Sequence, residues 1–120
     1  MFSGQAVAAG ARQVLALEPT PTTAQAFERN LAASLVTGTV SILWKGAWDS
    51  HDTMCFRVYP GQPGRSSLEL RPPAPDAYDI QIDVLPIDAL VAEYGLERVD
   101  FIKMNIEGAE VRALRGASET

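Results

Sequence analysis

The sequence is poor in the residues that several classes of protein require. It has one cysteine, Cys55, which excludes an internal disulfide, and one histidine, His51, so no paired Cys/His spacing predicts a metal site. No apolar run approaches the roughly 20 residues that span a bilayer, and the N-terminus lacks the basic start and apolar core of a signal peptide. We therefore expect no bound metal and no membrane, and a cytoplasmic location by default.

Basic residues are also scarce. Ten Lys and Arg stand against 15 Asp and Glu, giving a net charge of -5, and no Lys/Arg cluster supplies the attraction that a phosphate backbone needs. Nucleic acid is therefore not an expected partner. At 120 residues, of which 47% are hydrophobic, the chain suffices for one domain with a modest core, at the small end for an α/β enzyme.

The spacing of apolar residues predicts an alternation of helices and strands. Helices are expected within 1–12, from Pro21 to Gly38, over 87–94 and after the stretch at 99–110; strands are expected at 14–17, 40–44, 55–59, 80–84 and 101–104. We expect the strands at 40–44 and 55–59 to form a hairpin, and a long loop over 60–78. Val111 and Leu114 are expected on the buried face of the last helix. This order predicts an α/β fold.

Two short segments follow predicted strands and are candidates for a nucleoside site. Glu18 ends the apolar run at 14–17, where a carboxylate can accept hydrogen bonds from both ribose hydroxyls or can simply cap the next helix. Gly46 and Ala47 follow the strand at 40–44. Small residues there leave room for a flat ring such as adenine, or form a tight turn. The residues alone do not decide between ribose binding and helix capping for Glu18, or between an adenine site and a tight turn for Gly46 and Ala47.

The stretch from Val99 to Glu110 places polar residues after an apolar run. Phe101–Met104 is predicted as a strand buried on both faces, and Asn105 and Glu107 then fall at its carboxyl end, where ligands bind in α/β sheets. Glu107 and Glu110 are three residues apart and are expected on one face of the first helical turn. First-turn acids are also an ordinary helix-start signal, so both interpretations stand.

These residues carry a family resemblance. The run Asp100-Phe-Ile-Lys-Met-Asn-Ile-Glu-Gly-Ala-Glu110 resembles the signature of the FkbM family of S-adenosylmethionine-dependent methyltransferases, in which Ile-Lys-hydrophobic-Asp-hydrophobic-Glu-Gly-Ala-Glu follows a strand. Asn105 stands where that pattern has Asp. Further segments occur in the family's order: 11–19, Asn30-Leu31, 46–49, 66–68 and 87–90.

The resemblance implies a Rossmann-like methyltransferase fold, a three-layer α/β sandwich, with S-adenosylmethionine as cofactor. It implies that Glu18 binds the cofactor ribose and that Gly46 and Ala47 lie beside the adenine. Asn105 and Glu107 would face the transferred methyl group and the acceptor. The pair Ser66 and Ser67 is assigned by the same resemblance to the substrate, a small molecule or a glycan.

Some parts of the family pattern are absent. Family members carry a first strand and a glycine loop before the helix that begins near Phe2, and they carry further strands at the end. Residues 1–120 are therefore interpreted as a partial methyltransferase domain without that first strand, its loop and the last strands. We expect such a chain to be inactive as it stands, to bind the cofactor weakly or not at all, and to self-associate through exposed sheet edges.

Three functions are compared. The first is O-methyl transfer to a hydroxyl, in which Glu107 accepts the proton because the amide of Asn105 cannot. The second is a non-catalytic remnant or pairing module without cofactor. The third is a nicotinamide dinucleotide enzyme, in which Glu18 would also bind ribose, but this leaves the run at 99–110 unexplained.

Overall fold

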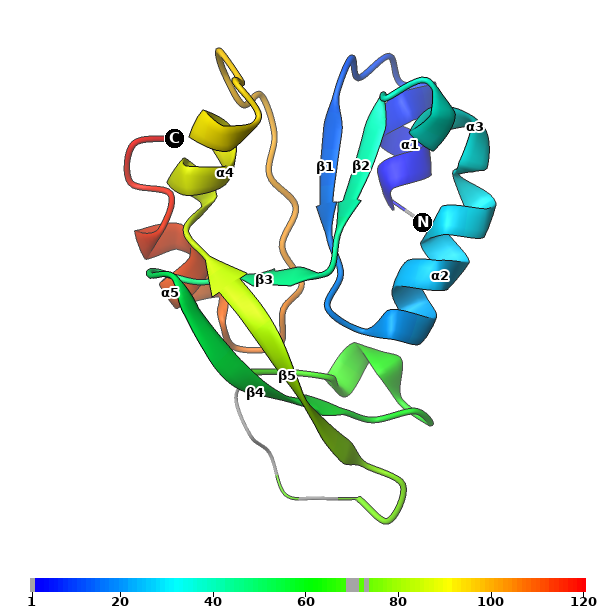
Figure 1. Ribbon diagram of the computed structural model, residues 1–120, viewed down its shortest axis with the longest axis vertical. Helices are drawn as coiled ribbons and strands as arrows, with labels where there is room; N and C mark the ends of the chain where they lie inside the picture. Colours follow the sequence, from blue (N-terminus) through cyan, green and yellow to red (C-terminus); the bar gives the residue numbers. More distant parts are fainter. Residues whose placement is uncertain (1, 69–71, 73) are drawn as a thin grey trace. The chain divides into compact units, whose positions relative to one another are not determined.

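The computed structural model describes residues 2–68, 72 and 74–120, and it divides into two compact units, 1–45 and 46–120. Each unit is mixed α/β (Figure 1). The long loop predicted over 60–78 is described only in part, because four of its residues and Met1 lie outside the described residues. Among the described helices, none is long and apolar enough to cross a membrane.

The first unit is built on two parallel strands. Strand β1 (Val14–Leu17) pairs in register with β2 (Val40–Leu43), so that Val14 lies opposite Val40 and Leu17 opposite Leu43. Helix α1 (Phe2–Ala8) contacts β1, while α2 (Pro21–Asn30) and α3 (Ala32–Val36) contact β2. Both predicted strands of this unit are therefore confirmed, and their parallel pairing puts their carboxyl ends at one edge of the sheet.

Helix α2 begins as its sequence predicts. Pro21 occupies the first turn, where a missing N–H costs nothing, and Thr20 precedes it as the N-cap residue. The Thr20 side chain makes no capping hydrogen bond. Ala24 and Leu31 are buried, Phe27 and Leu35 are half-buried, and the helix breaks at Leu31 before α3 continues.

The second unit contains a three-stranded sheet in the order β3-β5-β4. The strands are β3 (Lys45–Ala47), β4 (Asp52–Val58) and β5 (Tyr78–Leu85), and β4 runs antiparallel to β5. The predicted hairpin between 40–44 and 55–59 is wrong. The first of those segments pairs with β1, and the second pairs with β5, because the alternating apolar residues of β4 and β5 match face to face.

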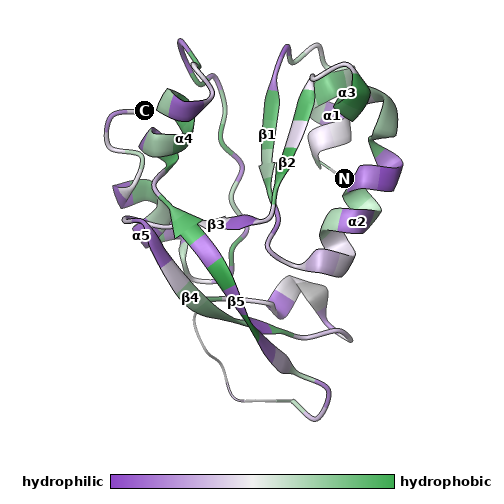
Figure 2. Ribbon diagram, viewed as in Figure 1, coloured by the Kyte–Doolittle hydropathy of each residue, from purple (hydrophilic) through white to green (hydrophobic). Residues whose placement is uncertain are grey.

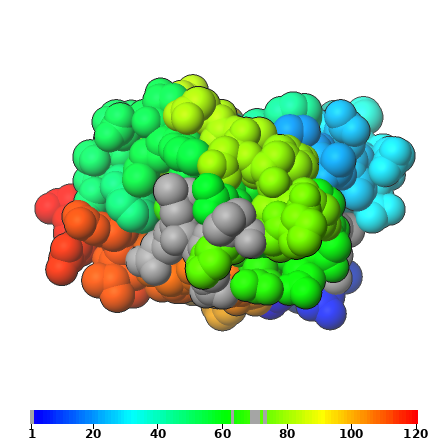
Figure 3. Space-filling model, turned by 90° about the horizontal axis from the view of Figure 1, so that it is seen from below, coloured from blue at the N-terminus to red at the C-terminus, as the bar shows by residue number. Residues whose placement is uncertain are grey.

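One face of this sheet is the core of the second unit. Phe56, Val58, Ile82 and Val84 are buried together, and β5 shows the alternation of apolar and polar residues clearly (Figure 2). The opposite face carries Thr53, Cys55 and Arg57 of β4 opposite Asp83, Gln81 and Asp79 of β5. Residues of β4 and β5 lie side by side at the surface (Figure 3).

Helices α4 (Ile87–Glu93) and α5 (Glu110–Arg115) complete the second unit. Gly95, the predicted end of α4, has a positive φ of 60°, as expected of a helix-stopping glycine. The predicted buried face of α5 is wrong: Val111 and Leu114 are 61% and 58% exposed. The one buried residue of the helix is Ala113, which is fully buried, and Ala109 directly before the helix is 1% exposed.

The segment Phe101–Met104 is not a strand. It belongs to the irregular chain between α4 and α5, and Phe101 and Ile102 are 68% and 39% exposed, so the predicted buried strand is wrong for the chain as it stands. The described strands are β1 and β2 in one sheet and β3, β5 and β4 in the other. An apolar run becomes a strand only when a neighbour completes its ladder, so composition alone could not decide this segment.

Gly116 at the end of α5 allows a close backbone approach. A Cβ atom built there would overlap the carbonyl oxygen of Trp48 and lie 3.0 Å from Cα of Pro86. The Gly116 carbonyl also accepts the N–H of Asp88 at 2.8 Å, at the start of α4. Gly116 thus joins the end of α5 to α4 and to the segment after β3.

We expect Gly116→Ala to lower the free energy of unfolding by about 1–3 kcal/mol, because a methyl group forced against backbone must displace it. Gly64→Ala is the matched control, since a Cβ at Gly64 meets nothing within 4 Å, and a surface substitution of this kind changes stability by about 0.5 kcal/mol or less. Urea denaturation of both variants measures the difference. Equal midpoints for the two variants would contradict the proposed close approach.

Candidate functional site

Glu18 stands at the carboxyl end of β1, directly beside the end of β2. Its N–H donates to the carbonyl of Leu43 at 2.9 Å, which extends the parallel ladder by one bond and fixes the backbone of Glu18 at the edge of the sheet. The side chain turns back, and its Oε1 accepts the N–H of Thr20 at 2.8 Å. One carboxylate oxygen of Glu18 therefore accepts a hydrogen bond just before α2, in line with the helix-capping interpretation. The binding of ribose by Glu18 stays a prediction.

The packing of the second sheet limits the size of the residue at position 46. A Cβ atom at Gly46 would approach the side chains of Val84 and Ile82 to 3.1 and 3.2 Å, so these two residues of β5 occupy the space beside the glycine. Gly46 is buried and Ala47 half-buried in β3. The packing of the sheet accounts for the glycine at this position, and the predicted place of adenine beside Gly46 and Ala47 rests on the family resemblance.

The turn before α5 has an unusual backbone. Glu107 has a φ of 56° and Gly108 a φ of 107°, and Glu107 is the one described non-glycine residue with positive φ. A left-handed conformation at a non-glycine residue costs about 1–3 kcal/mol and persists only where surrounding contacts enforce it. The helix itself begins at Glu110, so Glu107 and Glu110 do not share a helical face, and that prediction is wrong.

Glu110 is one of the groups that enforce this turn. Its Oε1 accepts the N–H of Ile106 at 3.0 Å, and its Oε2 accepts the N–H of Gly108 at 2.9 Å. These backbone donors favour the ionised form and lower the pKa of the Glu110 carboxyl. Glu110 is therefore a structural acid of the turn, which agrees with its interpretation as a helix-start residue.

Ser67 is the second group that holds the turn. Its hydroxyl donates to the carbonyl oxygen of Glu107 at 3.0 Å, across 40 positions of sequence, and the residue is only 1% exposed. The neighbouring Ser66 accepts the N–H of Tyr59 at 3.1 Å through its Oγ. Both serines predicted to bind substrate thus have structural hydrogen bonds, which the sequence pattern gave no means to foresee.

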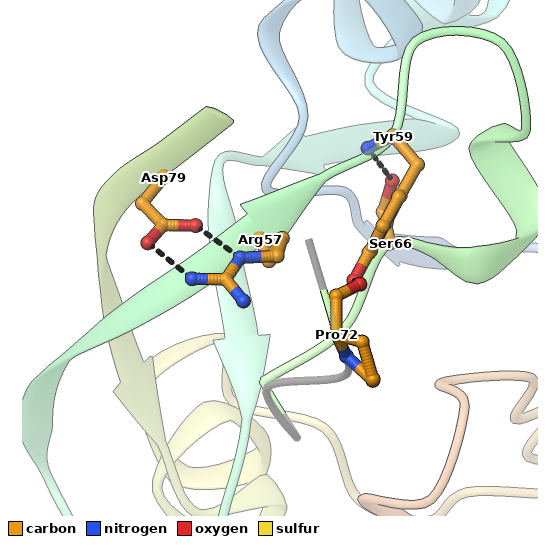
Figure 4. Close-up of polar contacts among 5 residues, drawn as sticks. All are labelled: Arg57, Tyr59, Ser66, Pro72 and Asp79. Carbon is orange, nitrogen blue, oxygen red and sulfur yellow. Dashed lines mark hydrogen bonds and ion pairs between the residues drawn. The ribbon is translucent and has the colours of Figure 1, made fainter. Parts of the chain in front are cut away.

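The loop carrying these serines is fastened to β4. The backbone N–H of Arg57 donates to the carbonyl of Ser67 at 3.0 Å, and the N–H of Ser67 donates to the carbonyl of Arg57 at 3.1 Å. The Arg57 side chain in turn forms two 2.7 Å bonds to the carboxylate of Asp79 on β5 (Figure 4). This ion pair lowers the pKa of Asp79.

A third contact joins the segment after β3 to α5. The guanidinium of Arg112 bonds Asp49 at 2.7 Å and lies 5.5 Å from the centre of the Trp48 ring. The bond to Arg112 lowers the pKa of Asp49. The sequence gives no sign of this contact, because the partner of an exposed arginine depends on the tertiary fold.

Asn105 is exposed and lies two residues before Glu107. Within the second unit the structure therefore brings Ser67, Asn105 and Glu107 into one neighbourhood through the turn, whereas Glu18 belongs to the first unit. Over the described ranges, no group of three or more His, Cys, Asp or Glu residues could hold a metal ion. The side chains that could take part in chemistry are the Glu107 carboxylate and the Asn105 amide at the turn, and the Glu18 carboxylate after β1.

The arrangement of elements is similar to that of a known enzyme structure. The crystal structure of Methyltransferase FkbM from Methylobacillus flagellatus KT matches with a TM-score of 0.61 and 23% sequence identity, covering 97% of this chain and 25% of that one. The predicted α/β, Rossmann-like methyltransferase fold class is therefore confirmed.

The sequence comparisons establish the family. The Methyltransferase FkbM domain matches residues 4–120, so the chain belongs to the FkbM methyltransferase family. Methyltransferase 1 of Beauveria bassiana (strain ARSEF 2860) is 29% identical over 123 residues, covering 88% of this chain and 49% of the relative. Methyltransferase sdnD of Sordaria araneosa is 27% identical over 134 residues, covering 89% and 52%. The chain spans about half the length of these relatives.

The lowered pKa of Glu110 predicts an acid-sensitive turn. Because the folded-state pKa lies below the unfolded one, the carboxylate stabilises the protein above the unfolded pKa, and this contribution is lost as the pH falls through the folded pKa. Glu110→Gln should therefore be less stable than the unmodified protein at pH 7, and the gap should shrink on acidification. Urea denaturation from pH 7 to pH 3 measures it.

The same substitution at Glu28, an exposed residue of α2, is the matched control, and we expect it to leave the stability profile close to that of the unmodified protein. A gap for Glu110→Gln that stays constant over the whole pH range would contradict the role of the charge.

Proposed function

We propose that this chain is part of a methyltransferase domain which, when complete, transfers a methyl group from S-adenosylmethionine to a hydroxyl of a small molecule or sugar, and that the chain is inactive as it stands. The observation that supports this most directly is the family match over 4–120, together with the strained turn at Glu107 inside the family's signature. Strained non-glycine residues gather at functional sites, where held geometry serves chemistry. The family match also favours a methyl donor over a nicotinamide dinucleotide.

In this proposal Glu18 binds the ribose of the cofactor. An acid at the carboxyl end of a parallel strand suits two vicinal hydroxyls, since a carboxylate offers two acceptor oxygens. The position of Glu18 at the shared edge of β1 and β2 fits this role. Gly46 and Ala47 are proposed beside the adenine by resemblance, and the cofactor supplies the electrophilic methyl group.

The acceptor side is assigned to the turn before α5. A hydroxyl that takes a methyl group loses its proton, and Glu107 is the carboxylate that would accept it. Asn105 would orient the acceptor through its amide, because an amide takes up no proton near neutral pH. Resemblance assigns Ser66 and Ser67 to the substrate. In this proposal they support the acceptor side of the site through its backbone, since the Ser66 hydroxyl bonds Tyr59 and the Ser67 hydroxyl bonds Glu107.

A second candidate is a non-catalytic pairing module. It is favoured by large apolar side chains exposed on the second unit: Phe101 is 68% exposed, Val111 61% and Leu114 58%. Surfaces of this kind mark association sites or aggregation liabilities. This candidate requires no cofactor and predicts self-association, so binding and mass measurements separate the two functions.

Cofactor binding is the first test. We expect nuclear magnetic resonance titration with S-adenosylmethionine to give weak, localised shifts at Glu18, Gly46 and Ala47. Glu18→Gln should abolish them, whereas Glu28→Gln should not. A dissociation constant near 1 μM, which corresponds to about -8 kcal/mol, would contradict the expected weakness. No shifts at any concentration, with a dimer in light scattering, would favour the pairing module.

The catalytic assignment is tested in an extended chain that restores the first strand and its glycine loop, by transfer of a labelled methyl group to a panel of hydroxyl acceptors. We expect Asn105→Asp to raise the rate, because it restores the acid of the family signature. Glu107→Gln should lower the rate by roughly 10²–10⁴-fold, the usual contribution of a positioned base. Glu119→Gln, outside the turn, is the control. Unchanged rates for Glu107→Gln would exclude this residue as the base.

A further inference from the structure

The backbone at Glu107 raises a question that the family signature does not answer. A glutamate occupies a left-handed conformation, with a φ of 56°, directly before Gly108, whose positive φ of 107° a glycine adopts without strain. Glutamate gives no intrinsic preference for this region. The conformation therefore depends on contacts made by other parts of the chain.

Two side chains supply such contacts. Glu110 binds the N–H groups of Ile106 and Gly108, which flank Glu107, and these bonds are local. Ser67 reaches the carbonyl oxygen of Glu107 itself from a distant segment. The direction of that carbonyl follows from the backbone angles on either side, so a donor fixed in space selects one conformation of the turn.

Ser67 is itself firmly placed. Its backbone exchanges two hydrogen bonds with Arg57 on β4, and the Arg57 side chain is bonded twice to Asp79 on β5. The residue is 1% exposed, so its hydroxyl is withheld from water and its bond to Glu107 has little competition from solvent. The sheet of the second unit thus holds the donor rigidly against the turn.

We propose that Ser67 is a positioning residue, whose buried hydroxyl holds Glu107 in the left-handed conformation and thereby sets the direction of the Glu107 carboxylate. The proposal rests on the proposed function in so far as Glu107 is the base. It gives Ser67 a role beyond the substrate contact that resemblance assigns: the hydroxyl acts on the backbone of Glu107, and the carboxylate acts on the acceptor.

The test uses amide hydrogen exchange in the full chain, followed by nuclear magnetic resonance at Gly108 and Ile106. In Ser67→Ala, loss of one buried hydrogen bond should raise exchange at Gly108 by about tenfold, the factor equivalent to about 1.4 kcal/mol. Ser66→Ala is the matched control. Its hydroxyl bonds Tyr59, so exchange should rise at Tyr59 and stay unchanged at Gly108.

A rescue variant separates positioning from simple packing. Glycine adopts the left-handed conformation without strain, so Glu107→Gly combined with Ser67→Ala should return exchange at Gly108 to near its original rate. A purely structural loss around Ser67 would not be repaired by a change at position 107. If Ser67→Ala fails to fold by circular dichroism, Ser67→Cys, which keeps a weak donor of similar size, should show a smaller rise in exchange.

Unchanged exchange at Gly108 in Ser67→Ala, an equal rise in Ser66→Ala, or absence of rescue by Glu107→Gly would each overturn the proposal. Methyl transfer is measured in parallel. In the extended chain used for the catalytic test, Ser67→Ala should lower kcat more than it changes KM for S-adenosylmethionine, because the Ser67 hydroxyl bonds Glu107 on the acceptor side. If Glu107→Gln leaves methyl transfer unchanged, the proposed function fails at Glu107, while the exchange data still decide whether Ser67 holds the turn.

Discussion

The antiparallel pairing of β4 with β5 is the constraint on which the second unit depends. Seven residues of β4 lie opposite seven of β5, and the register puts Phe56, Val58, Ile82 and Val84 together on one face. Val84 and Ile82 then leave little space for a side chain at Gly46, and Arg57 anchors the loop that carries Ser67. A slip of one residue would turn these side chains to the opposite face and would undo both contacts.

The elements that could be predicted from sequence are those whose signals are local. Pro21 after Thr20 marks the start of α2, Gly95 marks the end of α4, and the apolar run at 14–17 becomes β1. Each depends on backbone preferences of a few neighbouring residues. The family signature is also local in this sense, since it is a contiguous run of residues.

The predictions that failed depend on contacts between distant residues. The strand at 55–59 was assigned to the wrong partner, because Val40 and Phe56 are both suited to a strand and only the tertiary fold decides which neighbour each finds. The spacing of Val111 and Leu114 predicts a buried pair, yet both are exposed and Ala113 is the buried residue of α5, because the face that a short helix buries is set by its tertiary neighbours. The bond between Ser67 and Glu107 spans 40 positions and leaves no trace in either local pattern.

Cys55 lies on the outer face of β4, opposite Gln81 and near Asp79. Burial raises the pKa of its thiol, and the negative charge of Asp79 raises it further. The thiolate is the form that attacks disulfides, alkylating reagents and peroxides, so this cysteine is a weak nucleophile at neutral pH. The Cys55 thiol therefore forms mixed disulfides more slowly than an unperturbed thiol, and a thiol-directed label would react faster with a cysteine introduced at an exposed position.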